Sequence, residues 1–107
     1  MSWEIEYIPE AMKELAGLNQ SVRPQIIAGI RKVAQNPLSR QEGGYGDPLG
    51  HHGALDLTGL YKLKFKKPGI RVVYQLRRER EKMIIVVIGV RSGEEVYRTA
   101  AKRKDTL

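Results

Sequence analysis

The sequence predicts an α+β domain in which an N-terminal helical hairpin packs on one face of a twisted, four-stranded antiparallel sheet, in the order β-α-α-β-β-β. Residues 2–36 contain one alternating segment, followed by two stretches with apolar residues at helical spacing. From residue 60 onward, apolar segments with the periodicity of strands are separated by turn residues. With 107 residues, 41% of them hydrophobic, the chain suits a single domain over residues 1–107.

The N-terminal segment supplies one strand and both helices. Residues 2–8 alternate apolar and acidic side chains, which predicts a half-buried strand. Pro9 suits the first turn of a helix, because its missing N–H would have no partner there. Ser21 suits the N-cap of a second helix, which Asn36 and Pro37 end. The apolar stripe of this second helix consists of Ile26, Ile27, Ile30, Val33 and Ala34.

The C-terminal half contains the remaining strands. Residues 38–59 are rich in glycine and weakly patterned, so we expect a long loop there. Strands are expected at residues 60–66, 70–77 and 83–90, with a short extended piece around residues 95–97. Residues 68 and 69, Pro-Gly, indicate a turn between the first two of these strands. The continuous apolar run at residues 83–88 predicts a central strand that is covered on both faces.

Charge is distributed unevenly along the chain. Residues 1–59 carry five Lys/Arg against seven Asp/Glu, whereas residues 60–107 carry fourteen against five. This asymmetry predicts a polyanionic partner for the C-terminal half, either nucleic acid or an acidic protein or both. A solvated basic surface is the alternative. Because the chain has no cysteine, it can form neither a disulfide framework nor a thiolate zinc site, and we expect no metal or cofactor.

The sequence predicts a cytoplasmic protein without a membrane partner. Residues 1–6 already contain Glu4 and Glu6, and they lack the basic start and apolar core of a signal peptide. No apolar run approaches the roughly 20 residues that a membrane-spanning helix needs.

Alternation along the strands concentrates cations on one face of the sheet. In residues 60–66, one face receives Tyr61, Leu63 and Phe65, and the other receives Lys62, Lys64 and Lys66. If Pro68 and Gly69 form a two-residue turn, Lys66 pairs with Arg71, and Arg71 joins the lysine face with Gln75. A shift by an even number of residues would keep this sorting. We therefore expect an apolar, core-facing side and a phosphate-binding side, the alternative for the lysines being a solubilising sheet edge.

A lysine on this basic face is the strongest candidate for a general base. Repulsion among neighbouring cations favours the neutral form of a lysine, which can then accept a proton. The adjacent His51 and His52 could in principle bind a metal or assist acid–base chemistry. Because neither cysteine nor a cluster of carboxylates lies nearby in the sequence, we interpret both as ordinary loop residues.

Five positions in the C-terminal half carry a resemblance to a known family. Residues 60–65 and 69–75, and then Arg91 followed by residues 95–97, resemble the second half of the RelE toxins of the RelE/ParE superfamily. The N-terminal strand, the helical hairpin and the Asn-Pro stop match that family too, so only the glycine-rich loop falls outside the resemblance. The joint match consists of Lys62, Lys64, Arg71, Arg91 and Tyr97.

This resemblance implies a type II toxin that cleaves messenger RNA in the A site of the 30S ribosomal subunit, without a metal. The ribose 2′-OH would attack the adjacent phosphate, with Lys64 as the general base and Lys62 adding charge, or with the two lysines exchanged. Arg71 would hold the scissile phosphate, Arg91 would stabilise or protonate the leaving group, and Tyr97 would stack on or orient the nucleotide. Further RNA contacts are expected from Lys66, Lys102 and Arg103.

The resemblance also implies a cognate antitoxin, with which the chain would form a hetero-oligomer and whose acidic or amphipathic segment would cover the basic face. The sequence departs from the family at Ser92 and Gly93, where further basic residues are common, and in the long loop at residues 41–59.

Two other functions stay open. One is a ParE-like toxin that inhibits DNA gyrase without catalysis, although such chains generally lack the five matched residues. The other is a non-enzymatic RNA-binding module.

Overall fold

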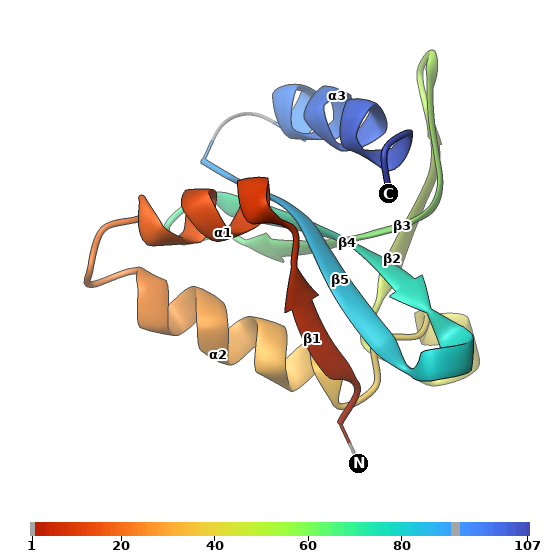
Figure 1. Ribbon diagram of the computed structural model, residues 1–107, viewed down its shortest axis with the longest axis horizontal. Coiled ribbons are helices and arrows are strands. Elements are labelled where there is room, and N and C mark those ends of the chain that lie inside the picture. Colours follow the sequence, from red (N-terminus) through yellow and green to blue (C-terminus); the bar gives the residue numbers. More distant parts are fainter. Residues whose placement is uncertain (1, 91–92) are drawn as a thin grey trace.

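The computed structural model describes residues 2–90 and 93–107. In these residues, a mixed five-stranded sheet of order β1-β5-β4-β3-β2 has helices on both faces (Figure 1). The strands are β1 (Glu4–Tyr7), β2 (Asp47–His52), β3 (Leu55–Phe65), β4 (Ile70–Arg77) and β5 (Lys82–Gly89). The α-helices are α1 (Pro9–Ala16), α2 (Arg23–Ala34) and α3 (Gly93–Lys104). None of the helices in this described part is long and apolar enough to cross a membrane.

The expected four-stranded antiparallel sheet is wrong at both edges. At one edge, β1 pairs with β5 in parallel, with Glu4 opposite Lys82 and Tyr7 opposite Ile85. At the other edge, β2 pairs with β3 inside the region that we expected to be a loop. Turn signals fix the pairing of strands that follow each other, but they say nothing about the direction in which β1 meets a strand from the far end of the chain.

The expected loop contains a strand because an edge position tolerates residues that a central strand does not. Pro48 and Gly50 interrupt the alternation in β2, and the register between β2 and β3 shifts between these two residues. A proline without an N–H and a glycine with positive φ are both accommodated at an edge or a bulge. The chain thereby forms a β2–β3 hairpin that stands beside α3 (Figure 1).

Residues 95–97, expected as an extended piece, instead lie in α3. The valine and tyrosine at positions 96 and 97 favour a strand over a short window. Over a longer window, however, the buried Val96, Tyr97 and Ala100 have helical spacing. Acidic residues in the first turn and basic residues in the last turn also stabilise a helix of this direction through its dipole.

The helical hairpin of α1 and α2 covers one face of the sheet, as the sequence predicted. Ile26 and Ile30 of α2 are fully buried against Val72, Tyr74 and Ile85. The side chains of this cluster also include Tyr61, Leu63 and Phe65, which confirms the predicted sorting of the β3 side chains. The expected register is wrong by two residues, because Arg71 lies opposite Lys64 and not opposite Lys66. An even shift leaves every side chain on its predicted face.

Helix α3 covers part of the opposite face, which the predicted fold left open. Val96 and Tyr97 pack there with Leu60, Val73 and Val87 in a second apolar cluster. Gly89 permits the close approach, since a Cβ at this position would lie 2.6 Å from a Val96 methyl carbon. The lysine face is therefore a surface shared between exposed cations and a docked helix.

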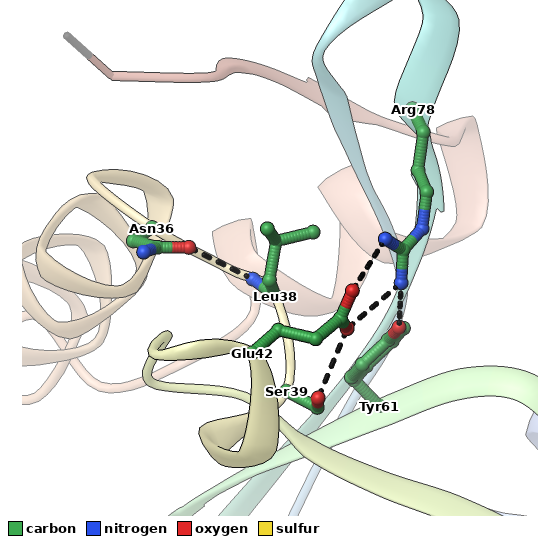
Figure 2. Close-up of polar contacts among 6 residues, drawn as sticks. All are labelled: Asn36, Leu38, Ser39, Glu42, Tyr61 and Arg78. Atoms are coloured by element: carbon green, nitrogen blue, oxygen red, sulfur yellow. Dashed lines mark hydrogen bonds and ion pairs between the residues drawn. The ribbon is translucent and has the colours of Figure 1, made fainter.

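A polar network fixes the segment between α2 and β2 against the end of the sheet (Figure 2). Arg78 donates two hydrogen bonds to the Glu42 carboxylate, at 2.8 and 3.0 Å, and one to the Tyr61 hydroxyl at 3.2 Å. The Ser39 hydroxyl also donates to Glu42. These bonds to Arg78 and Ser39 lower the pKa of Glu42 to about 2. The Tyr74 hydroxyl adds a buried bond to the Pro37 carbonyl.

Candidate nucleic-acid interface

Three of the predicted site residues lie next to one another on the α3 face of the sheet. Lys64 in β3 is directly opposite Arg71 in β4, and Lys62 is opposite Val73. Alternation places these cations on the face that also carries Val73 and Leu60. Lys64 is exposed, whereas Lys62 and Arg71 are half-buried. The sequence predicted that they share a face, and the observed register, which differs from the expected one by two residues, places Lys64 opposite Arg71.

The charge of this group is not neutralised by neighbouring carboxylates. Within residues 2–90 and 93–107, Lys62, Lys64 and Arg71 make no ion pair. Asp47 lies opposite Lys62 in the register, but its carboxylate binds the Arg40 guanidinium at 2.8 Å. Three uncompensated cations on one sheet face create a positive field that attracts a polyanion such as RNA.

Two buried polar atoms on the same face have no hydrogen-bond partner among the described residues: Arg71 Nε and Gln75 Oε1. Leaving such a group unsatisfied costs about 1–3 kcal/mol, and most buried polar atoms in proteins therefore have a partner. Sequence reasoning placed Gln75 on the lysine side but did not select it as a site residue. The available signal was its position four residues after Arg71, on the same face of β4.

Tyr97 lies on this face but does not face solvent. Its side chain is 5% exposed and packs with Leu57, Leu60 and Val73. Its ring also meets the His52 ring edge to face, with centroids 4.8 Å apart and planes inclined by 70°. In this arrangement His52, which is exposed, stands between Tyr97 and solvent at the tip of the β2–β3 hairpin.

The remaining predicted RNA contacts differ in their availability. Lys66 and Lys102 are exposed. Arg103 instead donates to both oxygens of the Glu14 carboxylate, at 2.9 and 3.0 Å, and to the Val86 carbonyl at 2.8 Å. Arg103 therefore holds α3 to α1 and β5 and is not free for RNA in this conformation. Arg91 lies outside the described residues.

The Glu14 and Arg103 pair has a clear structural origin. Because β1 ends at Tyr7, opposite Ile85, no strand of the described residues lies beside the edge of β5 beyond that point. The Glu14 carboxylate accepts a hydrogen bond from the Ile88 N–H, and Arg103 donates to the Val86 carbonyl. The two side chains thus satisfy backbone groups that a longer β1 would have paired.

The two histidines occupy different surroundings. His51 Nε2 lies 3.9 Å from Asp56 Oδ1, whereas His52 contacts Tyr97. In the portion of the chain that the structure describes, no three side chains of the types His, Asp or Glu gather as metal ligands would. The pair is thus divided between the two sides of β2, and only His52 faces α3.

Comparison with known proteins places this architecture among bacterial toxins. Residues 5–97 match the family model described as "ParE toxin of type II toxin-antitoxin system, parDE". Over 103 residues the chain is 28% identical to the mRNA interferase toxin RelE of Escherichia coli K12, and the match covers 96% of this chain and 98% of that protein.

Solved structures of relatives share the fold. A mutant of the E. coli toxin RelE in the free state, with two arginines replaced by alanine, superposes with a TM-score of 0.75 at 26% identity, and the match covers 96% of this chain and 98% of that chain. The same mutant in complex with a peptide of the antitoxin, RelBc, gives a TM-score of 0.68 at 28% identity with the same coverage of both chains.

Proposed function

The chain belongs to the ParE toxin family of type II toxin–antitoxin systems, and we propose that it is the toxin of such a system and an endoribonuclease acting on translated messenger RNA. The observation that carries the proposal is the group of Lys62, Lys64 and Arg71, adjacent on one sheet face and without carboxylate partners among the described residues. The relationship to a protein named mRNA interferase supports the same reaction.

The proposed reaction needs no metal. Lys64 acts as the general base that removes the proton from a ribose 2′-OH, and the 2′-oxygen attacks the adjacent phosphorus. The bond from phosphorus to the 5′-oxygen breaks, which leaves a 2′,3′-cyclic phosphate and a 5′-oxygen whose charge Arg91 stabilises or to which Arg91 donates a proton. Lys62 and Arg71 stabilise the charge that develops on the phosphate oxygens. The two lysines could exchange roles.

The other residues predicted to contact RNA differ in how exposed they are. Lys66 and Lys102 are exposed cations that suit contacts with RNA phosphates. Tyr97 orients the nucleotide indirectly, through the residues packed on it, because its own ring is buried. Arg103 is left out of the proposed RNA contacts, because its guanidinium is bound to Glu14 and to the Val86 carbonyl.

The proposed partners are the ribosome with its messenger RNA, in the cytoplasm, and a cognate antitoxin. Relatives have been solved with RelB, and one with the RelBc peptide. The excess of fourteen cations over five acidic residues in residues 60–107 suits an antitoxin segment of acidic or amphipathic character. Expression of the native operon should yield both proteins in one complex, and a chain that purifies alone and is harmless to its host would contradict this.

Mapping transcript ends after induced expression tests the nuclease. The wild-type chain should arrest growth and produce cuts that follow the reading frame of translated messages. Lys64→Ala and Arg91→Ala, each produced at the same level, should leave messages intact and permit growth. Frame-independent cuts, or cuts that persist in both variants, would contradict the proposed site.

The second candidate function is inhibition of DNA gyrase through protein contacts. The match to the ParE family model favours it, since the matched family carries that name. A gyrase inhibitor would cause DNA damage while messages stay intact, and it should tolerate Lys64→Ala far better than a nuclease does. The same induction experiment therefore separates the two candidates.

A further inference from the structure

The exposed aromatic surface next to Tyr97 belongs to the β2–β3 hairpin. Tyr97 is 5% exposed, while the His52 ring lies 4.8 Å from it and is open to solvent. The hairpin reaches this position because of its glycines: Gly59 in β3 has φ +87°, and Gly50 in β2 has φ +60° beside the register shift. These left-handed positions redirect both strands and bring the hairpin alongside α3 (Figure 1).

A cleft lies between the hairpin tip and the N-terminal half of α3. Its volume is about 400 Å³, and it is lined by His52, Gly53, Ala54, Leu55, Glu94 and Arg98. Glu94 and Arg98 form an ion pair across one turn of the helix at 2.6 Å, and both side chains are largely exposed. The cleft thus combines an aromatic ring, a guanidinium, a carboxylate and a small apolar floor.

We propose that this cleft binds one nucleobase of the RNA substrate, with His52 as the stacking surface and Tyr97 as the ring that holds His52 in position. This inference rests on the proposed nuclease function. Single-stranded RNA is commonly recognised by bases stacked on aromatic side chains or on arginine planes. His52 meets that requirement because its ring is exposed, whereas Tyr97 is enclosed by its own cluster.

The polar residues of the cleft give it a preference among bases. A carboxylate such as that of Glu94 accepts hydrogen bonds from the exocyclic amino groups of adenine, cytosine and guanine, whereas uracil lacks an amino group and offers only its N3–H, between two carbonyl oxygens that repel the carboxylate. The Arg98 guanidinium can stack on the base or bind the adjoining phosphate. The cleft should therefore disfavour uracil at one fixed position near the cut.

The cleft is connected to the basic face through Tyr97. The Tyr97 ring packs with Leu60 and Val73, and Val73 lies opposite Lys62 in the β3–β4 register. One RNA strand could cross Lys62 and Lys64 with its phosphates and place a base against His52. Tyr97 is in this view a positioning residue for His52, not a stacking residue itself.

The neighbouring histidines, His51 and His52, supply a matched pair of variants for the test. His52→Ala should lower cleavage of translated messages at least tenfold and flatten the base preference at one position near the cut, and His52→Phe should restore most of the rate. His51→Ala, in the same strand but paired with Asp56, should cleave like the wild type. Thermal unfolding of all variants shows whether each is folded. If His52→Ala cleaves with the wild-type base preference, or if His52→Phe is as impaired as His52→Ala, the proposal is overturned.

Two further measurements distinguish base binding in the cleft from the nuclease activity itself: the Glu94→Gln variant and the binding of free nucleotides to the protein. Glu94→Gln should change the base preference while leaving cuts in frame. Histidine ring signals in nuclear magnetic resonance, recorded with each of the four ribonucleoside 5′-monophosphates, should move for His52 and not for His51. If the wild type makes no cuts but His52 still responds, the nuclease fails and the cleft stands. If the wild type cuts and neither histidine responds to any nucleotide, the cleft fails and the nuclease stands.

Discussion

The sheet face under α1 and α2 differs from the face under α3 in whether its buried polar groups have hydrogen-bond partners. On the first face, the hydroxyl of the fully buried Tyr74 donates to the Pro37 carbonyl at 2.9 Å. On the second face, Arg71 Nε and Gln75 Oε1 are buried with no partner in residues 2–90 or 93–107. The polar group of the first face is thus paired within the fold, whereas the second face combines unpaired polar atoms with cations that have no carboxylate partner among the described residues.

The helices that cover the two faces also differ in how they are attached to the sheet. The apolar side chains of α1 and α2 form one large cluster with the sheet. Gly29 in α2 allows close contact with Phe65, since a Cβ at position 29 would lie 2.4 Å from the Phe65 ring. Helix α3 buries fewer side chains and depends in addition on the ion pair of Glu14 with Arg103. Both covers combine packing with polar contacts, since Gln25 of α2 also donates to the Lys67 carbonyl at 2.9 Å. The second cover has less packing, and the Glu14–Arg103 pair therefore carries a larger share of its attachment.

The largest difference between the faces should appear when one core residue and one cation are removed. Ile30→Ala, on the α2 face, should lower the free energy of unfolding by about 2–5 kcal/mol, because a fully buried side chain leaves a cavity. Lys64→Ala, on the α3 face, should change it by less than about 0.5 kcal/mol, because the side chain is exposed. Urea denaturation followed by circular dichroism measures both values.

In an RNA cleavage assay, Lys64→Ala should be the more impaired of these two variants, although it is the less destabilised. Folded Ile30→Ala should retain cleavage at a temperature below its transition, and Lys64→Ala should lose it. If Lys64→Ala lowered the free energy of unfolding as much as Ile30→Ala does, the α3 face would contribute to the core in the same way as the α1/α2 face. The two faces would then not differ in function as described above.

The sequence predicted the first face better than the second, for a physical reason. Alternation in β3 and β4 sorted Leu63, Val72 and their neighbours correctly, because a period of two survives an even error in register. The same alternation located Lys62, Lys64 and Arg71 on one face. Local patterns were thus sufficient wherever neighbouring strands determine the outcome.

Features that depend on distant contacts could not be predicted. The burial of Tyr97 results from α3 docking beside a hairpin that begins at Asp47, fifty residues earlier, and nothing local to Tyr97 indicates that His52 covers it. The role of Arg103 likewise depends on Glu14, at the other end of the chain. The helical spacing of Val96, Tyr97 and Ala100, in contrast, was visible and would have indicated α3.

The attachment of α3 should be the next most sensitive feature. Arg103→Met leaves the half-buried Glu14 carboxylate without its guanidinium, and we expect a loss of about 1–3 kcal/mol in the free energy of unfolding. Glu14→Gln should cost a similar amount, because the amide no longer balances Arg103. The double variant should cost less than the sum of the two, and simple additivity in a double-mutant cycle would argue against a coupled pair.

A smaller effect is expected from the two stacked tyrosines. The rings of Tyr61 and Tyr74 lie 5.2 Å apart and nearly parallel, so replacing either by phenylalanine keeps the aromatic contact. Tyr74→Phe should lower the free energy of unfolding by about 1 kcal/mol, since the Pro37 carbonyl loses its buried donor. Tyr61→Phe removes only a 3.2 Å bond to the exposed Arg78 and serves as the control. Equal losses in thermal unfolding would show that the ring, and not the Tyr74 hydroxyl, is responsible.

The smallest effect should come from Glu42, which lies outside both faces and pairs with Arg78 at the end of the sheet (Figure 2). Its pKa is lowered from 4.5 to about 2 in the folded chain, mainly by the hydrogen bonds from Arg78. A carboxyl group with a lowered pKa in the folded state stabilises the fold above its unfolded pKa, and this contribution disappears as the pH falls through the folded pKa.

The melting temperature of the wild type should consequently exceed that of Glu42→Gln above about pH 5, and the gap should close between pH 4.5 and pH 2. The pair is solvent-exposed, so salt should narrow the gap at neutral pH. RNA cleavage at neutral pH should be unchanged, since the network does not contact the cations of the α3 face. A gap that is constant from pH 7 to pH 2 would mean that Glu42 acts through packing instead of charge.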